Sequence, residues 1–397
     1  MTKKSDAPAI RFKGFSDAWE QRKFEEIAVR SSVICSDDTL PRVEYEDIVS
    51  GTGRLNKDIY AKQSSKSGIA FHQGDVLYGK LRPYLQNWLL PTFDGLAVGD
   101  FWVLQPQNAD SSFLYRLIQS RQFDEVANQS TGTKMPRADW KLVSKTVFSI
   151  PSNISEQAAI GTYFTALDSL ITLHQRKFEK LTNVKKSMLE KMFPQNGSSY
   201  PEIRFKGFTD PWEQRKVSDL AEKTYGGGTP TTSNEAYWNG DIPWIQSSDV
   251  VDGKLLGVEP RKWITQDGLN NSAAQLIPGN SIAIITRVGV GKLAFMPYSY
   301  ATSQDFLSLS KLNAEPLFTV YACYKKLQSE LNAVQGTSIK GITKDELLAK
   351  NIMVPRYAEQ QQIGAFFKQL DNLITLHQRE LEKLQNIKKS MLEKMFV

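Results

Sequence analysis

Two segments of the chain carry an apolar stripe with the period of a long amphipathic helix. In residues 156–193, apolar or histidine side chains recur at alternating steps of four and three, and Lys185 fills one gap. This heptad spacing predicts a helix that packs against another helix. At 1.5 Å per residue, the segment would be a rod of roughly 57 Å. The stripe comprises Ile160, Phe164, Leu167, Ile171, His174, Phe178, Leu181, Met188 and Met192.

The second stripe is a near copy of the first, because residues 167–193 return as 370–396 with only five mismatches in 27 positions. Neither helix can cover its stripe alone, so we expect the two to pack against each other, running antiparallel about a pseudo-two-fold axis. An alternative is that the helices only stabilise a monomer or form a homodimer. The copy comprises Ile363, Phe367, Leu370, Ile374, His377, Leu381, Leu384, Lys388, Met391 and Met395.

A second repeat marks the start of each half, since residues 10–23 return as 203–216. The segments between the repeats, 24–150 and 217–354, are diverged relatives that share landmarks at a common offset of 205, such as Arg82 with Arg287 and Asp100 with Asp305. The predicted fold class is therefore α+β: two related α/β domains joined by two long antiparallel helices in a coiled coil. The expected divisions are 1–150, a central helix at 151–193, a Pro/Gly/Ser linker at 194–202, 203–354, and a terminal helix at 355–397.

Composition places the chain among ordinary globular proteins, with 397 residues, 41% hydrophobic and 23% charged. It has no run of eighteen apolar residues, so we expect no membrane partner, and its first residues lack the apolar region of a secretory signal. The two cysteines, Cys35 and Cys323, are too far apart in sequence to indicate a disulfide framework, which favours a cytoplasmic location. With three histidines, we expect no histidine-rich zinc or iron centre, while carboxylate binding of Mg²⁺ stays open on residue counts; His174 and His377 are more typical of packed polar residues.

Charge is distributed in a way that limits any nucleic-acid interpretation. The net charge is +6, yet residues 24–150 hold 14 basic and 15 acidic side chains, and residues 217–354 hold 12 and 13. The positive excess therefore lies outside the two variable segments. If these segments bind DNA, they must do so through local clusters rather than a broad basic face.

Such clusters occur in loops at matching places of the two variable segments. Arginine or lysine beside Gly, Thr and Ser can contact guanine edges or phosphates. For Arg82 and Arg287 an alternative is an ion pair with Asp100 and Asp305, respectively. The candidate DNA-binding residues are Lys80, Arg82, Tyr84, Lys134 and Arg137 in the first segment, and Thr229, Thr231, Ser247, Ser248, Arg287, Lys292, Ser338 and Lys340 in the second.

No convincing catalytic motif is present. The glycines around Lys292 do not form a Walker loop, because Thr286 and Leu293 stand where glycine and Ser or Thr are required. Asp241, Asp252 and Lys254 have the loose spacing of a metal-dependent nuclease, which leaves a self-sufficient nuclease as one alternative function. A structural adaptor that never touches DNA is another. We therefore assign no catalytic and no metal-binding residue.

Taken together, the duplicated motifs resemble the DNA-specificity (S) subunit of Type I restriction-modification systems. The resemblance covers nearly the whole chain. It rests on GF-x-D-x-W-E at 14–20 and 207–213, on GDVLYGKLRPYL at 74–85, and on the EQ-x-x-I-G exit into LITLHQR and KKSMLEKMF in both halves.

The resemblance implies a non-catalytic subunit that binds double-stranded DNA. Each variable segment would be a target recognition domain reading one half of a bipartite, asymmetric sequence, and the helix pair would set the spacer between the halves. Two methyltransferase (M) subunits would dock on the repeated regions and restriction (R) subunits would join them. S-adenosylmethionine, ATP and Mg²⁺ would bind to these partners, with no cofactor in this chain.

Overall fold

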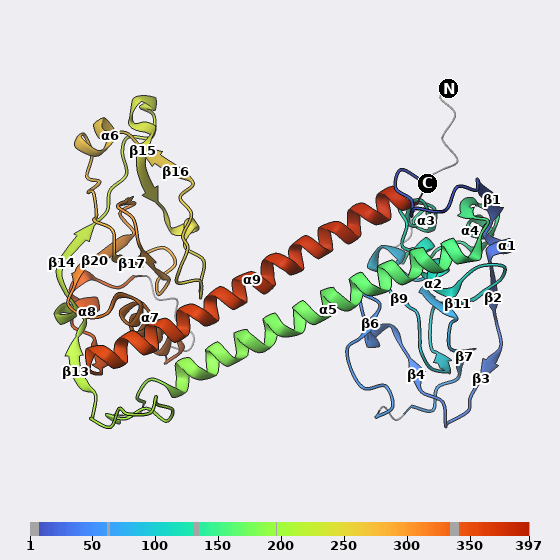
Figure 1. Ribbon diagram of the computed structural model, residues 1–397, viewed down its shortest axis with the longest axis horizontal. Coiled ribbons are helices and arrows are strands. Elements are labelled where there is room, and N and C mark those ends of the chain that lie inside the picture. Colours follow the sequence, from blue (N-terminus) through green and yellow to red (C-terminus); the bar gives the residue numbers. More distant parts are fainter. Residues whose placement is uncertain (1–7, 62–63, 130–134, 196, 334–340, 397) are drawn as a thin grey trace. The chain divides into compact units, whose positions relative to one another are not determined.

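The computed structural model describes residues 8–61, 64–129, 135–195, 197–333 and 341–396. Their contacts divide the chain into two compact units, which are described separately: unit 1 is 1–175 with 379–397, and unit 2 is 176–378. Each unit thus contains one variable body together with parts of both long helices, whereas the sequence-based division kept each helix whole (Figure 1). Among the described residues, no helix is long and apolar enough to cross a bilayer.

The body of unit 1 is built on two four-stranded sheets, in the strand orders β2-β11-β8-β9 and β3-β7-β10-β4, with the pairs β1-β12 and β5-β6 beside them. Its strands are β1 (Trp19–Lys23), β2 (Ala28–Ser31), β3 (Ile34–Cys35), β4 (Arg42–Val43), β5 (Ile48–Val49), β6 (Arg54–Leu55), β7 (Gly68–Phe71), β8 (Val76–Gly79), β9 (Trp88–Leu89), β10 (Gly95–Ala97), β11 (Phe101–Pro106) and β12 (Val147–Pro151). Its short helices are α1 (Phe24–Ile27), α2 (Ser111–Leu117), α3 (Arg121–Ala127) and α4 (Trp140–Lys145), with 3₁₀ turns η1 (Tyr45–Asp47) and η2 (Pro83–Leu85).

The body of unit 2 has the sheets β14-β20-β17-β18 and β16-β15-β19 and the pair β13-β21. Its strands are β13 (Glu213–Lys216), β14 (Ala221–Gly226), β15 (Trp238–Ile245), β16 (Lys262–Ile264), β17 (Ser281–Ile285), β18 (Leu293–Met296), β19 (Ala301–Thr302), β20 (Phe306–Leu312) and β21 (Asn351–Val354). Its helices are α6 (Gln266–Asn270), α7 (Pro316–Ala333) and α8 (Lys344–Leu348), with 3₁₀ turns η3 (Val217–Leu220), η4 (Glu235–Tyr237) and η5 (Ser247–Asp249).

The two bodies share one framework, as their common landmarks predict. Strands β2, β11, β8 and β9 correspond in order to β14, β20, β17 and β18, and every neighbouring pair is antiparallel. Each body also has one parallel pair at matching places, β4 with β10 and β15 with β19. The remaining strands of the sheets β3-β7-β10-β4 and β16-β15-β19 differ, so the two bodies diverge most in these sheets.

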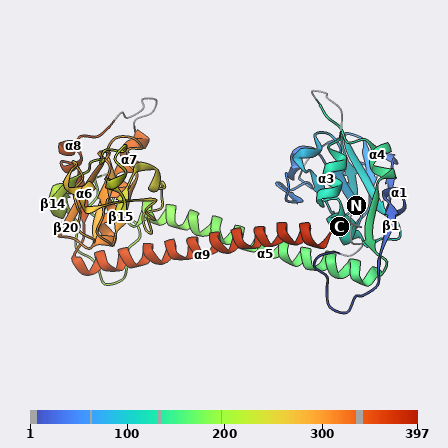
Figure 2. The same cartoon turned by 90° about the horizontal axis from the view of Figure 1, so that it is seen from above.

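The two long helices predicted from the apolar stripes are α5 (Ile154–Lys191) and α9 (Tyr357–Met395). In unit 1 the first part of α5 packs against the last part of α9: Asp168 Oδ1 lies 2.7 Å from Lys388 Nζ, and the rings of Phe164 and Phe396 are 6.4 Å apart. Ascending positions on α5 meet descending positions on α9, so these segments are antiparallel (Figures 1 and 2).

Unit 2 repeats this arrangement with the roles of the helices exchanged. Lys185 Nζ lies 2.6 Å from Asp371 Oδ1, and the rings of Phe193 and Phe367 are 6.0 Å apart. Lys185 and Asp371 occupy the repeat positions of Lys388 and Asp168. Every position predicted for the two apolar stripes is buried or half-buried, which is the burial that two adjacent amphipathic helices require.

The repeated motif at the start of each half holds the beginning of a long helix. Arg11 donates from Nε and Nη2 to the two carboxylate oxygens of Glu156, at 2.6 and 2.7 Å, and this glutamate is only 1% exposed. In unit 2, Arg204 donates to both carboxylate oxygens of Glu359 in the same way, at 2.8 Å for both bonds. A buried carboxylate needs such a partner, which gives a physical reason for the repeated arginine.

The glutamine that follows each of these glutamates joins the helix to the body. The side chain of Gln157 accepts from the backbone N–H of Asp110 and donates to the carbonyl of Pro151. In unit 2, Gln360 bonds in the same way to Glu315 and Pro355. The EQ pair therefore fixes the angle at which each helix leaves its body.

Replacing Arg11 with alanine should destabilise the start of α5 by about 3 kcal/mol, because Glu156 would remain buried without its cation. Amide hydrogen exchange should accelerate over 154–163 in this variant, and over 357–366 in Arg204→Ala. The control is Arg22→Ala, whose ion pair with Glu20 is about half exposed and should cost under about 1 kcal/mol. Equal acceleration at both helix starts from either substitution would contradict this assignment.

Candidate nucleic-acid interface

A strained turn follows β8 in unit 1 and projects the first candidate side chains. Arg82 and Gln86 flank η2 in the left-handed conformation, with φ of 49° and 56°. Few non-glycine residues adopt this conformation, and such strain is common at binding sites. Arg82 and Tyr84 are both exposed on this turn.

A second segment, 136–138, runs alongside this turn. The backbone N–H of Arg82 donates to the carbonyl of Pro136 at 2.7 Å, and that of Ala138 donates to the carbonyl of Lys80 at 2.8 Å. Two loops predicted separately from the sequence therefore meet, which brings Arg137 close to Lys80. Lys134 lies outside the described residues.

Asp100 organises the cations of this site. Its carboxylate lies 3.0 Å from Arg137 Nη2 and 3.5 Å from Lys80 Nζ. No ion pair joins Asp100 to Arg82, so that alternative for Arg82 does not hold among the described residues. Burial raises the pKa of Asp100, but the hydrogen bond and charge of Arg137, together with Lys80, outweigh burial and leave the pKa below its ordinary value. The carboxylate is therefore ionised at neutral pH and fixes both cations.

Tyr45, which the sequence reasoning missed, fastens the turn to the body. Its hydroxyl donates to the carbonyl of Asp100 at 2.6 Å and accepts from the backbone N–H of Leu81 at 2.9 Å. Burial raises the pKa of Tyr45, so the hydroxyl keeps its proton and remains a donor. An available signal was the matching of residues 45–49 with 247–251, which share an aspartate followed by two β-branched residues.

In unit 2 the equivalent turn joins β17 to β18. Arg287 and Val288 are exposed at its tip, and Lys292 is half-buried. Gly289 and Gly291 have φ of 93° and 90°, a conformation that favours glycine. A buried strand followed by a turn with basic side chains is thus present here as in unit 1.

The two arginines are not at the same structural position, which corrects the interpretation from the common offset. Strand pairing places Gly79 opposite Phe101 in unit 1, and Ile285 opposite Phe306 in unit 2. Counted from these pairs, Arg287 is structurally equivalent to Leu81, whereas the equivalent of Arg82 in unit 2 is Val288. Arg82 and Arg287 therefore project from different positions of their turns.

Asp305 stands at the position of Asp100 but holds hydroxyl groups instead of cations. Its carboxylate accepts from Ser247 Oγ at 3.1 Å and from Ser303 Oγ at 3.4 Å. Nearby, Thr229 Oγ1 donates to the side chain of Gln304 at 2.7 Å. Thr229 and Ser247, distant in sequence, thus meet at the segment 303–305.

The other candidates of unit 2 are less closely tied to this cluster. Ser248 is exposed and accepts from the side chain of Gln246, and Thr231 is exposed on the glycine-rich loop. Ser338 and Lys340 lie outside the described residues.

The nuclease alternative gains no support from the geometry. Asp241 lies in β15, whereas Asp252 and Lys254 lie in the loop after η5. In the described part of the chain, no three histidine, cysteine or acidic side chains are grouped so that they could hold a metal ion.

Comparison with known proteins finds that part of the chain is similar to one family. Residues 209–386 match the model of the Type I restriction modification DNA specificity domain. The match covers less than half of the chain. The chain is 28% identical over 193 residues to the MjaIX specificity subunit of Methanocaldococcus jannaschii, an alignment covering 47% of this chain and 44% of that protein. It is 31% identical over 227 residues to the EcoR124I/EcoR124II specificity subunit of Escherichia coli, covering 55% and 52%. The chain thus spans about half the length of these two relatives.

A solved structure supports the fold. The S subunit of a Type I restriction-modification system from M. genitalium superposes with a TM-score of 0.65 over 98% of this chain and 99% of that one, at 13% sequence identity. At this identity the likeness concerns the fold alone.

The ion pairs of Asp100 with Lys80 and Arg137 should weaken as the pH falls. Because the folded pKa of this carboxyl is lowered, its stabilisation is present above the unfolded value of about 3.9 and is lost as the pH falls through the folded value. At pH 7, Asp100→Asn should mimic that loss and accelerate amide exchange in residues 80–86 up to roughly fivefold, since half-exposed pairs contribute about 1 kcal/mol or less.

The control for this substitution is Asp94→Asn, which removes a carboxylate on the same body that pairs with His72. It should leave exchange in 80–86 unchanged. If exchange there rises at pH 6 in the unaltered chain, Asp100 is not the group responsible.

Proposed function

We propose that this chain is the DNA-specificity subunit of a Type I restriction-modification complex, reading a bipartite, asymmetric sequence. One observation carries the proposal: two bodies with the same framework present chemically different side chains from their loops. The site of unit 1 offers Lys80, Arg82 and Arg137, whereas that of unit 2 offers Arg287 with serine and threonine hydroxyls. Different donors on one framework suit the reading of two different base sequences.

The reading elements fit the physics of duplex recognition. Exposed arginine can make bidentate bonds to guanine, and hydroxyls can bond to bases or phosphates. Each body has a near-neutral charge, so local cations must supply the contacts, and partner subunits would add others. The two bodies would then read independent half-sites.

In this proposal the long helices set the distance between the half-sites. A continuous helix of 38 or 39 residues is stiff, and its apolar stripe is covered in each unit by the other helix. The number of unread base pairs would therefore follow from helix length rather than from either body.

The same helices would dock two copies of a methyltransferase subunit. Leu170 and Leu173 on α5 are 44% and 45% exposed, and their repeat positions Leu373 and Leu376 on α9 are 44% and 51% exposed. Each unit therefore presents one pair of exposed leucines. Two such matching pairs suit the docking of two copies of the same subunit.

A shallow groove on α5 strengthens this inference. Six of its seven lining residues are identical at the repeat positions on α9, and the seventh changes only from valine to isoleucine. The lining residues are Arg176, Glu179, Lys180, Asn183, Val184, Ser187 and Met188.

The chain itself would bind and not catalyse. Methylation would be carried out by the methyltransferase subunits with S-adenosylmethionine, and restriction subunits would supply ATP- and Mg²⁺-dependent cleavage. This chain would contribute the choice of sequence.

Substituting one arginine should affect one half-site only. In the assembled complex, Arg82→Ala should weaken discrimination in one half of the target by about 1–3 kcal/mol, roughly 5- to 150-fold, and Arg287→Ala should do so in the other. Genome-wide mapping of methylated sequences, repeated with each variant, measures this directly. Loss of both half-sites from either single change would refute independent reading.

Removing the exposed leucines of one unit should remove one methyltransferase subunit. We expect Leu170→Ser with Leu173→Ser to leave a complex with a single methyltransferase, the corresponding changes at Leu373 and Leu376 to do the same, and all four to leave none. Native mass spectrometry of the co-purified complex gives the stoichiometry. Two subunits retained by the fourfold variant would show that docking lies elsewhere.

A further inference from the structure

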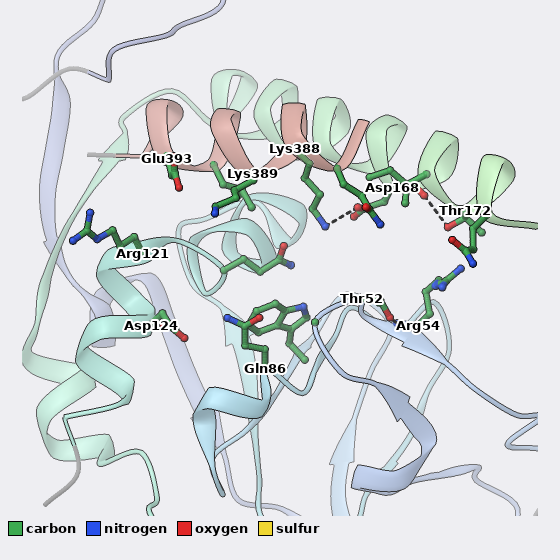
Figure 3. Close-up of a pocket in the computed structure, with 17 residues that line it drawn as sticks. Thr52, Arg54, Gln86, Arg121, Asp124, Asp168, Thr172, Lys388, Lys389 and Glu393 are labelled. Carbon is green, nitrogen blue, oxygen red and sulfur yellow. Dashed lines mark hydrogen bonds and ion pairs between the residues drawn. The ribbon is translucent and has the colours of Figure 1, made fainter. Parts of the chain in front are cut away.

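Unit 1 contains a half-open pocket of about 520 Å³ between its body and the two long helices (Figure 3). This volume lies within the range of pockets that bind ligands. Its walls come from the loops around β5, β6 and η2, from the region of α2 and α3, and from one face each of α5 and α9. Arg54 lies beside Thr52 and Thr172 at one end, and Arg121 and Glu393 lie at the other.

The charge around this pocket is not balanced. Arg116, just behind the wall, is only 2% exposed and lies 2.7 Å from Asp168 Oδ2. The other oxygen of the same carboxylate lies 2.7 Å from Lys388. One carboxylate therefore serves two cations, although a buried charge requires its own partner.

Two further cations on the pocket wall, Arg54 and Lys389, are available to a bound ligand. Lys388 is engaged by Asp168, and Arg121 lies 2.6 Å from Glu125. Within the described ranges, neither Arg54 nor Lys389 has an ion pair. The wall also carries the carboxylates Asp124, Asp168 and Glu393, but four wall cations and Arg116 outnumber these three, so the net positive charge favours an anion.

Two buried donors point to the same chemistry. Trp88, 6% exposed, and Gln119 both line the pocket, and the indole Nε1 and amide Nε2 have no acceptor in the described part of the structure. An unpaired buried donor costs about 1–3 kcal/mol, so a ligand made only of acceptors would fit best. An oxyanion is such a ligand.

Unit 2 satisfies the corresponding groups internally. Tyr321 stands at the position of Arg116 and donates its hydroxyl to Asp371 at 2.6 Å. Lys185, the repeat position of Lys388, binds Asp371 and also donates to the carbonyl of Gly253 at 3.0 Å. One cation meets one carboxylate there, so the unbalanced charge belongs to unit 1.

We infer that the pocket of unit 1 binds a backbone phosphate of the DNA duplex, a contact that unit 2 does not make. The inference rests on the proposed function. Continuity with the reading turn favours DNA over a free anion or a partner carboxylate: Gln86, on the pocket wall, ends the turn that begins at Arg82. A duplex lying on Arg82 would pass the mouth of the pocket.

Salt dependence of DNA binding tests this contact. With the full chain in complex with its methyltransferase subunits, Arg54→Ala and Lys389→Ala should each lower the slope of log K against log salt by about one, without changing sequence preference. Lys186→Ala is the matched control, because Lys186 is the exposed repeat position of Lys389 in unit 2. It should leave the slope unchanged.

Replacing single phosphates of the duplex by neutral methylphosphonates provides a second measurement that does not depend on folding. One replacement near the first half-site should weaken binding by the unaltered complex several-fold, and it should cost nothing more in Arg54→Ala, because the two changes remove the same contact. Additive losses at every phosphate would overturn the inference.

The remaining outcomes separate the two proposals. An unchanged salt slope with loss of a methyltransferase subunit from Lys389→Ala would overturn the inference and identify a partner carboxylate as the occupant. An unchanged slope and unchanged stoichiometry would overturn it as well. Absence of any sequence preference in the unaltered complex would instead refute the proposed function.

Discussion

The structure depends on the cost of exposing the apolar faces of two long helices. A helix of 38 residues with one apolar stripe gains little from propensity alone and must cover that stripe. In each unit, one part of α5 and one part of α9 provide that cover for each other, and the ion pairs Asp168–Lys388 and Lys185–Asp371 fix the register. The bodies are attached to this pairing.

Polar contacts attach each body to the start of its long helix and fix the angle between them. Glu156 and Glu359 are both 1% exposed, so each must meet the arginine of the repeated motif. Strand pairing closes the other side of each junction, β1 with β12 and β13 with β21. The candidate DNA-binding loops are therefore held by a rigid base, which the proposed selective recognition by a few side chains requires.

Long-period features could be predicted from the sequence, and local register could not. The apolar stripes were visible because heptad spacing persists over many turns. The offset that related Arg82 to Arg287 failed by one residue, because it was counted from identities and not from strand pairing. The partners of Asp100 depend on which loops meet, and the pocket around Arg54 is assembled from segments far apart in the sequence. The role of Glu156 was missed, although both it and Arg11 recur in the second half.

The nearly identical segments that border each body have a consequence for the gene. The two ends of each body are joined to the rest of the chain by the same contacts in both halves. The arginine motif makes the contact at one end, and the EQ pair at the start of the long helix makes it at the other. Homologous recombination between two such genes within these borders would exchange a whole body in frame, with its supporting contacts already in place. A lineage could thereby acquire a body with a different set of loops in one crossover.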